Sequence, residues 1–76
     1  MTRGDVVQIT YRGRSVRAMV LLASPNERSL MLGFDGALGD ADRGLFMGAM
    51  PVLQDDAGVY RDLLHGDEVV IAKAQP

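Results

Sequence analysis

The chain has 76 residues, 47% of them hydrophobic, and carries a formal net charge of −2 at pH 7. That hydrophobic fraction is typical of a globular protein and argues against disorder. With no cysteine and a single histidine, His65, the sequence excludes disulfides, thiolate zinc sites and multi-histidine metal sites. We expect residues 1–76 to form one small domain, whose core has to be efficient or supplemented by a partner subunit.

Neither export nor membrane insertion is indicated. The opening residues, MTRGDVVQIT, lack the apolar stretch of a secretory signal. The longest unbroken apolar run covers residues 18–23, whereas a bilayer span needs about 20 residues. We therefore expect a cytoplasmic protein with no membrane contact.

The first third of the chain predicts a β-hairpin. Apolar and polar residues alternate over Asp5–Tyr11, with the two-residue period of a half-buried strand. The run Arg14–Ala23 repeats the alternation and places Val16 and Val20 on one face. Gly13 supplies the permissive backbone of the turn between the two strands.

The middle third predicts two more strands around a long loop. Residues 24–28 are rich in turn formers, and a third strand follows over Ser29–Phe34. Residues 35–44, DGALGDADRG, hold three glycines and three aspartates, a composition that predicts a loop without strand or helix. Leu45–Leu53 is apolar but contains Pro51, which favours a bent or edge strand.

The last third predicts a turn and two short strands. Residues 55–58 form the turn, and a strand over Val59–Arg61 leads into a 3₁₀-like turn; the same region also fits a single helical turn that Gly66 ends. The last strand is predicted over Glu68–Ala74, before a frayed end at residues 75–76.

Nearly the same phrase opens and closes the chain. GDVVQI stands at residues 4–9 and GDEVVI at residues 66–71. In each copy a Gly-Asp turn releases the chain into a strand with two β-branched residues on one face. We expect these first and last strands to pair, because closing a barrel removes the two sheet edges. Five to six short antiparallel strands then form an all-β small barrel.

A resemblance to a known fold follows from the same residues. The strand order, the leading GDVVQITYRGRSVRAMVL with its glycine turn and the final GDEVVI strand resemble an SH3-like small barrel. The resemblance implies the fold alone and assigns no functional residue.

Catalytic and ion-binding candidates are few. His65 lies in LLHGDE, a turn-like context, and we interpret it as a turn residue and not as a general base. Asp35, Asp40 and Asp42 do not fit an EF-hand loop; they are either an improvised ion site or a solvated loop, and the sequence leaves both open. We predict a non-enzymatic protein without a cofactor.

Two binding surfaces are indicated. The second strand and residues 44–53 carry apolar groups on both faces, whereas a lone small barrel hides one face. We therefore predict contact with another protein, foremost a second copy in a homodimer. The predicted interface residues are Met19, Leu21, Phe46, Met47 and Met50. The alternative is a nucleic-acid surface in which arginines contact phosphates and a tyrosine stacks on a base. Its candidate residues are Tyr11, Arg12, Arg14, Arg17 and Arg28.

Overall fold

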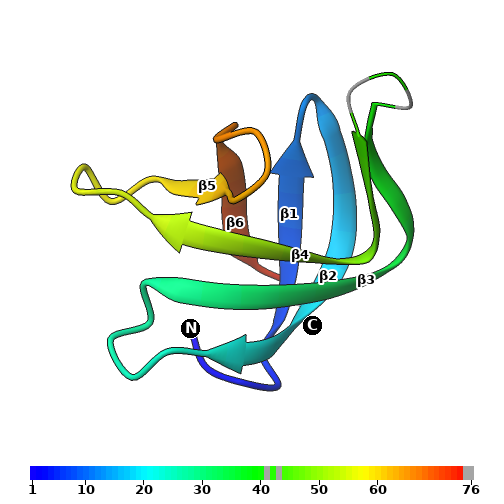
Figure 1. Cartoon of the computed structure of the whole chain (residues 1–76). Helices are drawn as coiled ribbons and strands as arrows, with labels where there is room; N and C mark the ends of the chain where they lie inside the picture. The colour runs from blue at the N-terminus through cyan, green and yellow to red at the C-terminus, as the bar shows by residue number, and fades with distance from the viewer. Residues whose placement is uncertain (41, 43, 75–76) are drawn as a thin grey trace.

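Six antiparallel strands form one sheet in the computed structural model, which describes residues 1–40, 42 and 44–74 (Figure 1). The strands are β1 Val6–Tyr11, β2 Arg14–Ala23, β3 Ser29–Asp40, β4 Gly44–Gln54, β5 Tyr60–Asp62 and β6 Val69–Lys73. Their order in the sheet is β5-β4-β3-β2-β1-β6, and the sheet curls into a nearly closed barrel. The predicted all-β small barrel is thereby confirmed. Among the described residues, no helix is long and apolar enough to cross a membrane.

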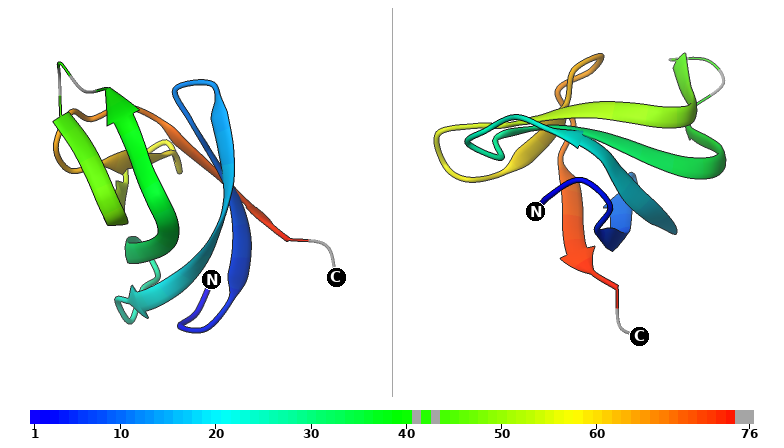
Figure 2. Two further views of the ribbon diagram at one scale, coloured as in Figure 1. Left: turned by 90° about the vertical axis from the view of Figure 1, so that its right-hand side faces the viewer. Right: turned by 90° about the horizontal axis from the view of Figure 1, so that it is seen from below.

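The two ends of the described chain close the barrel. β1 and β6 pair antiparallel, with Ile9 opposite Ile71, as the repeated opening and closing phrases predict. On the other side of the closure, Glu68, the residue before β6, forms an isolated bridge with Arg61 of β5. Figure 2 shows β3 and β4 on one side of the barrel and β1 and β6 on the other. The core therefore lies between these two groups of strands.

The third and fourth strands are longer than the sequence suggests. β3 continues from Ser29 to Asp40, so the predicted loop is wrong over residues 35–40. β4 begins at Gly44 and pairs with the end of β3, where Leu38 lies opposite Phe46. Residues 41, 43, 75 and 76 lie outside the described residues, and they include part of the predicted loop and the predicted frayed end.

Glycine bends β3 without ending it. The register of β3 against β4 shifts between Gly33 and Ala37, which is the signature of a bulge. Within and after the bulge, Gly36 and Gly39 adopt φ angles of +86° and +119°. A residue with a Cβ resists such angles, whereas glycine accepts them and lets the strand turn a corner. The glycines therefore curl the sheet toward closure.

The turn between β5 and β6 follows the helical alternative more closely than the 3₁₀ reading. The N–H of Gly66 donates to the carbonyl oxygen of Asp62 at 3.0 Å. A bond over four residues closes one α-type turn, whereas a 3₁₀ turn is closed over three. The flanking strands start one residue later than predicted, at Tyr60 and Val69.

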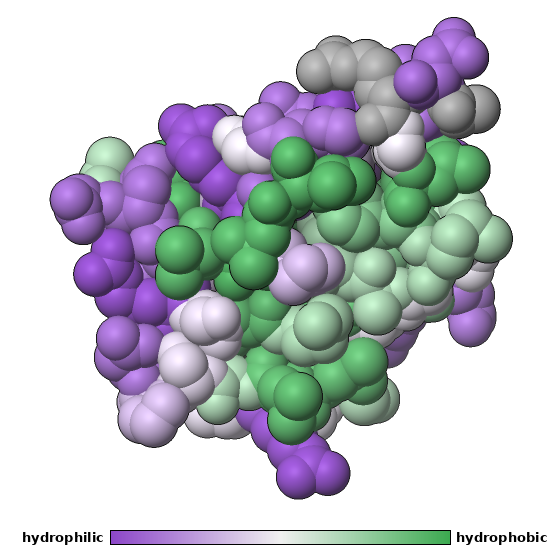
Figure 3. All heavy atoms as spheres, in the orientation of Figure 1, coloured by the Kyte–Doolittle hydropathy of each residue, from purple (hydrophilic) through white to green (hydrophobic). Residues whose placement is uncertain are grey.

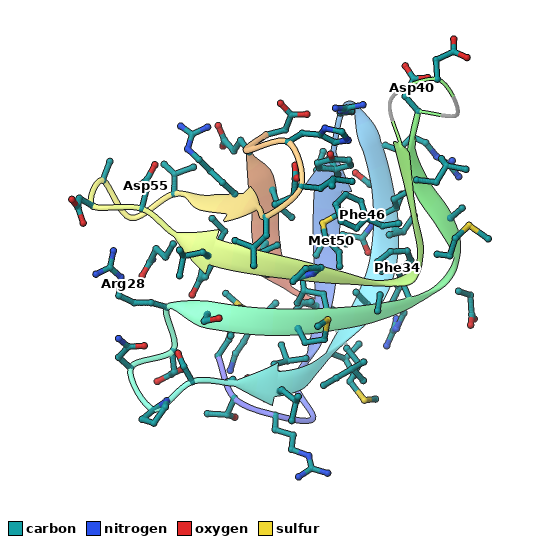
Figure 4. The ribbon with its side chains drawn as sticks, viewed as in Figure 1. Arg28, Phe34, Asp40, Phe46, Met50 and Asp55 are labelled. Carbon is teal, nitrogen blue, oxygen red and sulfur yellow. The ribbon has the colours of Figure 1, made fainter. Side chains whose placement is uncertain are left out.

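The inner faces of the strands supply the core. Its buried members are Val7, Ile9, Tyr11, Ala18, Val20, Leu30, Leu32, Leu38, Phe46, Met50, Val52 and Val69. Phe46 and Met50, labelled in Figure 4, are 8% and 0% exposed. The Phe46 ring meets the Tyr11 ring edge-on, with centroids 6.0 Å apart. The expectation that Phe46 and Met50 face outward does not hold, because the pairing with β3 turns this side of β4 inward.

Replacing Gly39 by alanine is expected to lower the free energy of unfolding by about 3 kcal/mol. The new Cβ would lie 2.7 Å from the carbonyl oxygen of Gly44, and a φ of +119° is strained for an L-residue. Gly36→Ala is the matched control, because its φ is also positive but nothing lies within 4 Å of the added atom. We expect it to lose only about 1 kcal/mol. Urea denaturation followed by circular dichroism measures both values; equal losses would contradict the close approach at Gly39.

Candidate functional site

An apolar surface covers the outer face of the three long strands. We call it the outer patch and define it as Met19, Leu21 and Leu22 of β2, Met31 and Gly33 of β3, and Met47, Ala49 and Pro51 of β4. Strand register places these residues in rows across the sheet: Met19, Gly33 and Ala49 form one row, and Leu22, Met31 and Pro51 form the next. Figure 3 shows hydrophobic atoms over the middle and right of the face crossed by β3 and β4.

The large side chains of the outer patch are open to solvent. Met19 is 44% exposed and Met47 is 72% exposed. Leu21 and Leu22 are 40% and 60% exposed. Single exposed apolar residues are ordinary on a protein surface, whereas a contiguous group over neighbouring strands marks an interaction surface.

Leu21 packs over Gly33 within the patch. Leu21 is the extra residue where the register of β2 shifts between Val20 and Leu22. Its side chain lies over Gly33, where an added Cβ would come within 2.8 Å of Leu21 Cδ1. Because Gly33 has no side chain, Leu21 lies along the sheet and joins the apolar surfaces of β2 and β3.

One end of the patch is hollowed into an open groove of ≈ 490 Å³. Its apolar lining includes Val6, Met19, Leu21 and Gly33, and its charged lining residues are Arg17 and Asp35. Ala18 pairs with Phe34, so Arg17 and Asp35 occupy the next positions on the two neighbouring strands. The groove therefore combines an apolar floor with one cation and one anion.

The structure divides the predicted interface residues into two groups. Met19, Leu21 and Met47 belong to the outer patch, whereas Phe46 and Met50 belong to the core. The pattern of β4 indicates two apolar faces, and only the pairing with β3 decides which one is inside. Leu22, Met31 and Pro51 are members of the patch that the sequence does not single out.

The predicted nucleic-acid residues do not form one surface. Tyr11 is 1% exposed, so its ring is not available to stack on a base. Arg12 donates from Nε to Asp67 at 2.8 Å, and its guanidinium carbon lies 5.3 Å from the centre of the Tyr11 ring. Arg14 begins β2, whereas Arg28 lies in the turn beyond the other end of that strand (Figure 4).

The Arg28 guanidinium is also engaged in contacts within the fold. Its Nη2 donates to the carbonyl oxygen of Gln54 at 2.9 Å and lies 3.3 Å from a carboxylate oxygen of Asp56. Of the five candidates, Arg17 alone lines the groove. No observation on the described residues therefore favours the nucleic-acid alternative.

Of the three aspartates of segment 35–44, Asp35 lies apart from Asp40 and Asp42. The Asp40 carboxylate accepts a hydrogen bond from the N–H of Asp42 at 2.9 Å, so it stabilises its own turn. Asp35 instead lines the groove on the outer face. Among the described residues, which include all three aspartates, no group of three metal-ligating side chains is close enough to hold an ion.

A buried carboxylate that the sequence analysis did not single out lies between β1 and β5. Asp62 is 2% exposed. Its Oδ2 accepts hydrogen bonds from the Tyr11 hydroxyl at 2.9 Å and from the N–H of Asp67 at 3.0 Å. Its Oδ1 accepts from the N–H groups of Leu64, at 2.9 Å, and His65. The signal that points to Asp62 is an aspartate at the start of a turn, because such a side chain accepts from the N–H two residues on, here that of Leu64.

These contacts shift two pKa values in opposite directions. Burial acts to raise the pKa of Asp62, but the hydrogen bonds from His65, Tyr11, Asp67 and Leu64 outweigh it and lower the pKa below its usual value. Burial, followed by the hydrogen bond to the Asp62 carboxylate, raises the pKa of Tyr11 to about 12. Asp62 is therefore an anion and Tyr11 a neutral donor over the whole physiological range.

The Asp62 carboxylate has a structural role. Both of its oxygens are committed to donors of the fold. His65 contributes its backbone N–H, and its Nε2 is buried against Gly44 without a hydrogen-bond partner among the described residues. This geometry presents no base to a substrate.

Comparisons of the chain with protein-family models, with curated proteins and with solved structures find no match. The resemblance to SH3-like barrels stays a prediction.

Replacing Asp62 by asparagine is expected to lower the free energy of unfolding by about 3 kcal/mol, because the amide turns a donor toward the buried N–H of Asp67 or the Tyr11 hydroxyl. Tyr11→Phe removes one donor and leaves the backbone bonds of the carboxylate, so we expect a loss of about 1.5 kcal/mol. Urea denaturation at pH 7 compares the two variants. An Asp62→Asn variant as stable as the unchanged protein would contradict the structural role.

Acid is expected to unfold the protein partly through Asp62. A carboxyl group whose folded pKa lies below its unfolded value of about 3.9 stabilises the fold above about pH 4. That contribution disappears as the pH falls through the folded pKa. Backbone hydrogen bonds also lower the pKa values of Asp5 and Asp55. The Asp62→Asn variant isolates the contribution of Asp62, because it has no titrating carboxyl group at this position. As the pH is lowered from 5, the free energy of unfolding should fall less steeply in the variant than in the unchanged protein.

Proposed function

We propose that this protein is a non-enzymatic contact domain that associates with a second copy of itself through the outer patch. The observation that carries the proposal is a contiguous apolar surface over β2, β3 and β4 on a barrel whose core is already filled from the inner faces. Apolar surface of this kind is stabilised by removal from water.

The described connections between the long strands do not supply cover for the patch. They are short, and the turn at residues 24–28 is held by its own hydrogen bonds. We therefore propose a partner as the source of cover. Methionines such as Met19 and Met47 suit this role, because flexible thioether side chains adapt to the shape of an opposing surface.

The size of the protein is compatible with such an interface. A standard interface buries about 800 Å² on each partner. The barrel exposes 4681 Å², so a contact of that size would cover about a sixth of it. The outer faces of β2 and β4 carry exposed large apolar side chains, among them Met19, Leu21, Leu22 and Met47, so we place the interface there.

A double variant, Met19→Lys with Met47→Lys, is expected to abolish self-association. The unchanged protein should sediment above 8.2 kDa at high micromolar concentration, and the variant should return to that mass. Two lysines in a dry interface cost several kcal/mol of binding free energy. Sedimentation equilibrium measures the mass, and circular dichroism checks the fold.

Val70→Lys is the matched control. Val70 is 51% exposed, comparable with Met19, but it lies on β6, beyond β1 from the outer patch. The Val70→Lys variant should show the same mass in sedimentation equilibrium as the unchanged protein. Gly33→Ala is a milder probe without added charge, because its Cβ lifts Leu21 off the sheet and should weaken association. An unchanged protein that stays at 8.2 kDa at high concentration would end the proposal.

A further inference from the structure

We infer that two copies pack their outer patches about a two-fold axis, with Arg17 of each copy against Asp35 of the other. The inference rests on the proposed self-association and adds the symmetry and the residues that select the partner. It starts from the two charges in the groove at one end of the patch.

Arg17 and Asp35 are charges in an apolar setting. Both line the groove together with Val6, Met19, Leu21 and Gly33. The ion pairs on the described residues use other groups. Arg12, Arg28 and Arg61 pair with Asp67, Asp56 and Asp55, and the amino terminus of Met1 pairs with Glu27. Neither Arg17 nor Asp35 joins an ion pair within the described part of the chain. Both charges therefore remain available to a partner.

Covering these charges with a purely apolar partner is unfavourable. A charge removed from water without a counter-charge loses its hydration, and a single truncated partner in a buried pair costs several kcal/mol. An occupant that supplies an anion for Arg17 and a cation for Asp35 avoids this cost. A second copy of this chain carries both on an apolar surface of the same shape.

A two-fold axis satisfies both requirements at once. In such an interface each contact occurs twice. If Arg17 of the first copy meets Asp35 of the second, Arg17 of the second copy also meets Asp35 of the first. Arg17 and Asp35 stand on neighbouring strands, at the positions that follow the Ala18–Phe34 pair. An axis beside these positions places each arginine against the partner's aspartate. A head-to-tail contact would leave one patch of the pair uncovered and would extend into larger assemblies.

Opposite charge reversals test the pairing. Arg17→Asp gives a chain with two acids at this site, and Asp35→Arg gives a chain with two arginines. We expect each variant alone to associate at least about tenfold more weakly than the unchanged protein, because like charges meet across the axis. An equimolar mixture of the two should form a heterodimer of twice 8.2 kDa, since both cross-pairs then join opposite charges. Native mass spectrometry distinguishes the heterodimer from either homodimer by mass.

Arg14→Asp is the matched control. It changes the net charge as much as Arg17→Asp and lies on the same strand, but Arg14 stands at the hairpin end, outside the groove. It should associate like the unchanged protein. If a reversal variant fails to fold by circular dichroism, Arg17→Gln and Asp35→Asn replace it, and each should weaken association by a few-fold.

The outcomes separate this inference from the proposed function. If the unchanged protein associates but both single variants do so equally well, and their mixture shows no preference for the heterodimer, the cross-pairs are wrong and self-association stands. If the unchanged protein forms assemblies that grow with concentration beyond two copies, the two-fold axis is wrong. If the unchanged protein is monomeric at high concentration, the proposed function fails, and the inference fails with it.

Discussion

The buried carboxylate of Asp62 joins the two edges of the sheet that strand pairing leaves almost unconnected. β5 has three residues, and an isolated bridge joins its Arg61 to Glu68, the residue before β6. The Asp62 carboxylate accepts hydrogen bonds from the β1 side chain of Tyr11 and from the turn that leads into β6. A charge at 2% exposure is tolerable only with such a set of donors. The same donors fix the turn and align β6 with β1.

The outer patch lies on the strands that bend most. Bulges in β2 and β3, together with glycines at positive φ, let three long strands bend around a core that one of their faces fills. The other face of these strands carries the outer patch. On that face the Leu21 side chain lies where a side chain of residue 33 would stand. Gly33 therefore lets Leu21 pack against the backbone of β3.

Three arginines hold turns of the barrel in place. Arg12 binds Asp67, Arg28 binds the Gln54 carbonyl, and Arg61 binds Asp55, each linking segments at the rim of the barrel. Such exposed pairs contribute little stability individually, yet they neutralise the charge that a nucleic-acid surface would need. Arg17 differs because it lies on the apolar face beside Asp35, where a charge has a larger effect on the choice of partner.

Part of this organisation could be predicted from residues alone. Alternation over β1 and β2 predicts the hairpin with the observed bounds of β2, and the repeated Gly-Asp phrase predicts the pairing of β1 with β6. Segment 35–44 was mispredicted over residues 35–40, because composition shows that glycines permit positive φ but not whether a strand uses that freedom to bend or to end. The apolar pattern predicts one interface of Met19, Leu21, Phe46, Met47 and Met50. Three of these side chains are exposed, whereas Phe46 and Met50 are buried in the core.

The sequence by itself determined the strand periods, the turns and the presence of apolar groups on two faces, because these depend on neighbours along the chain. Only the tertiary structure decided which face of β4 points inward, that Asp62 meets Tyr11 fifty-one positions away, and that Asp35 stands beside Arg17. Those relations depend on the register between strands and on the closure of the sheet. A shift of one residue in that register reverses the two faces without any change in the sequence.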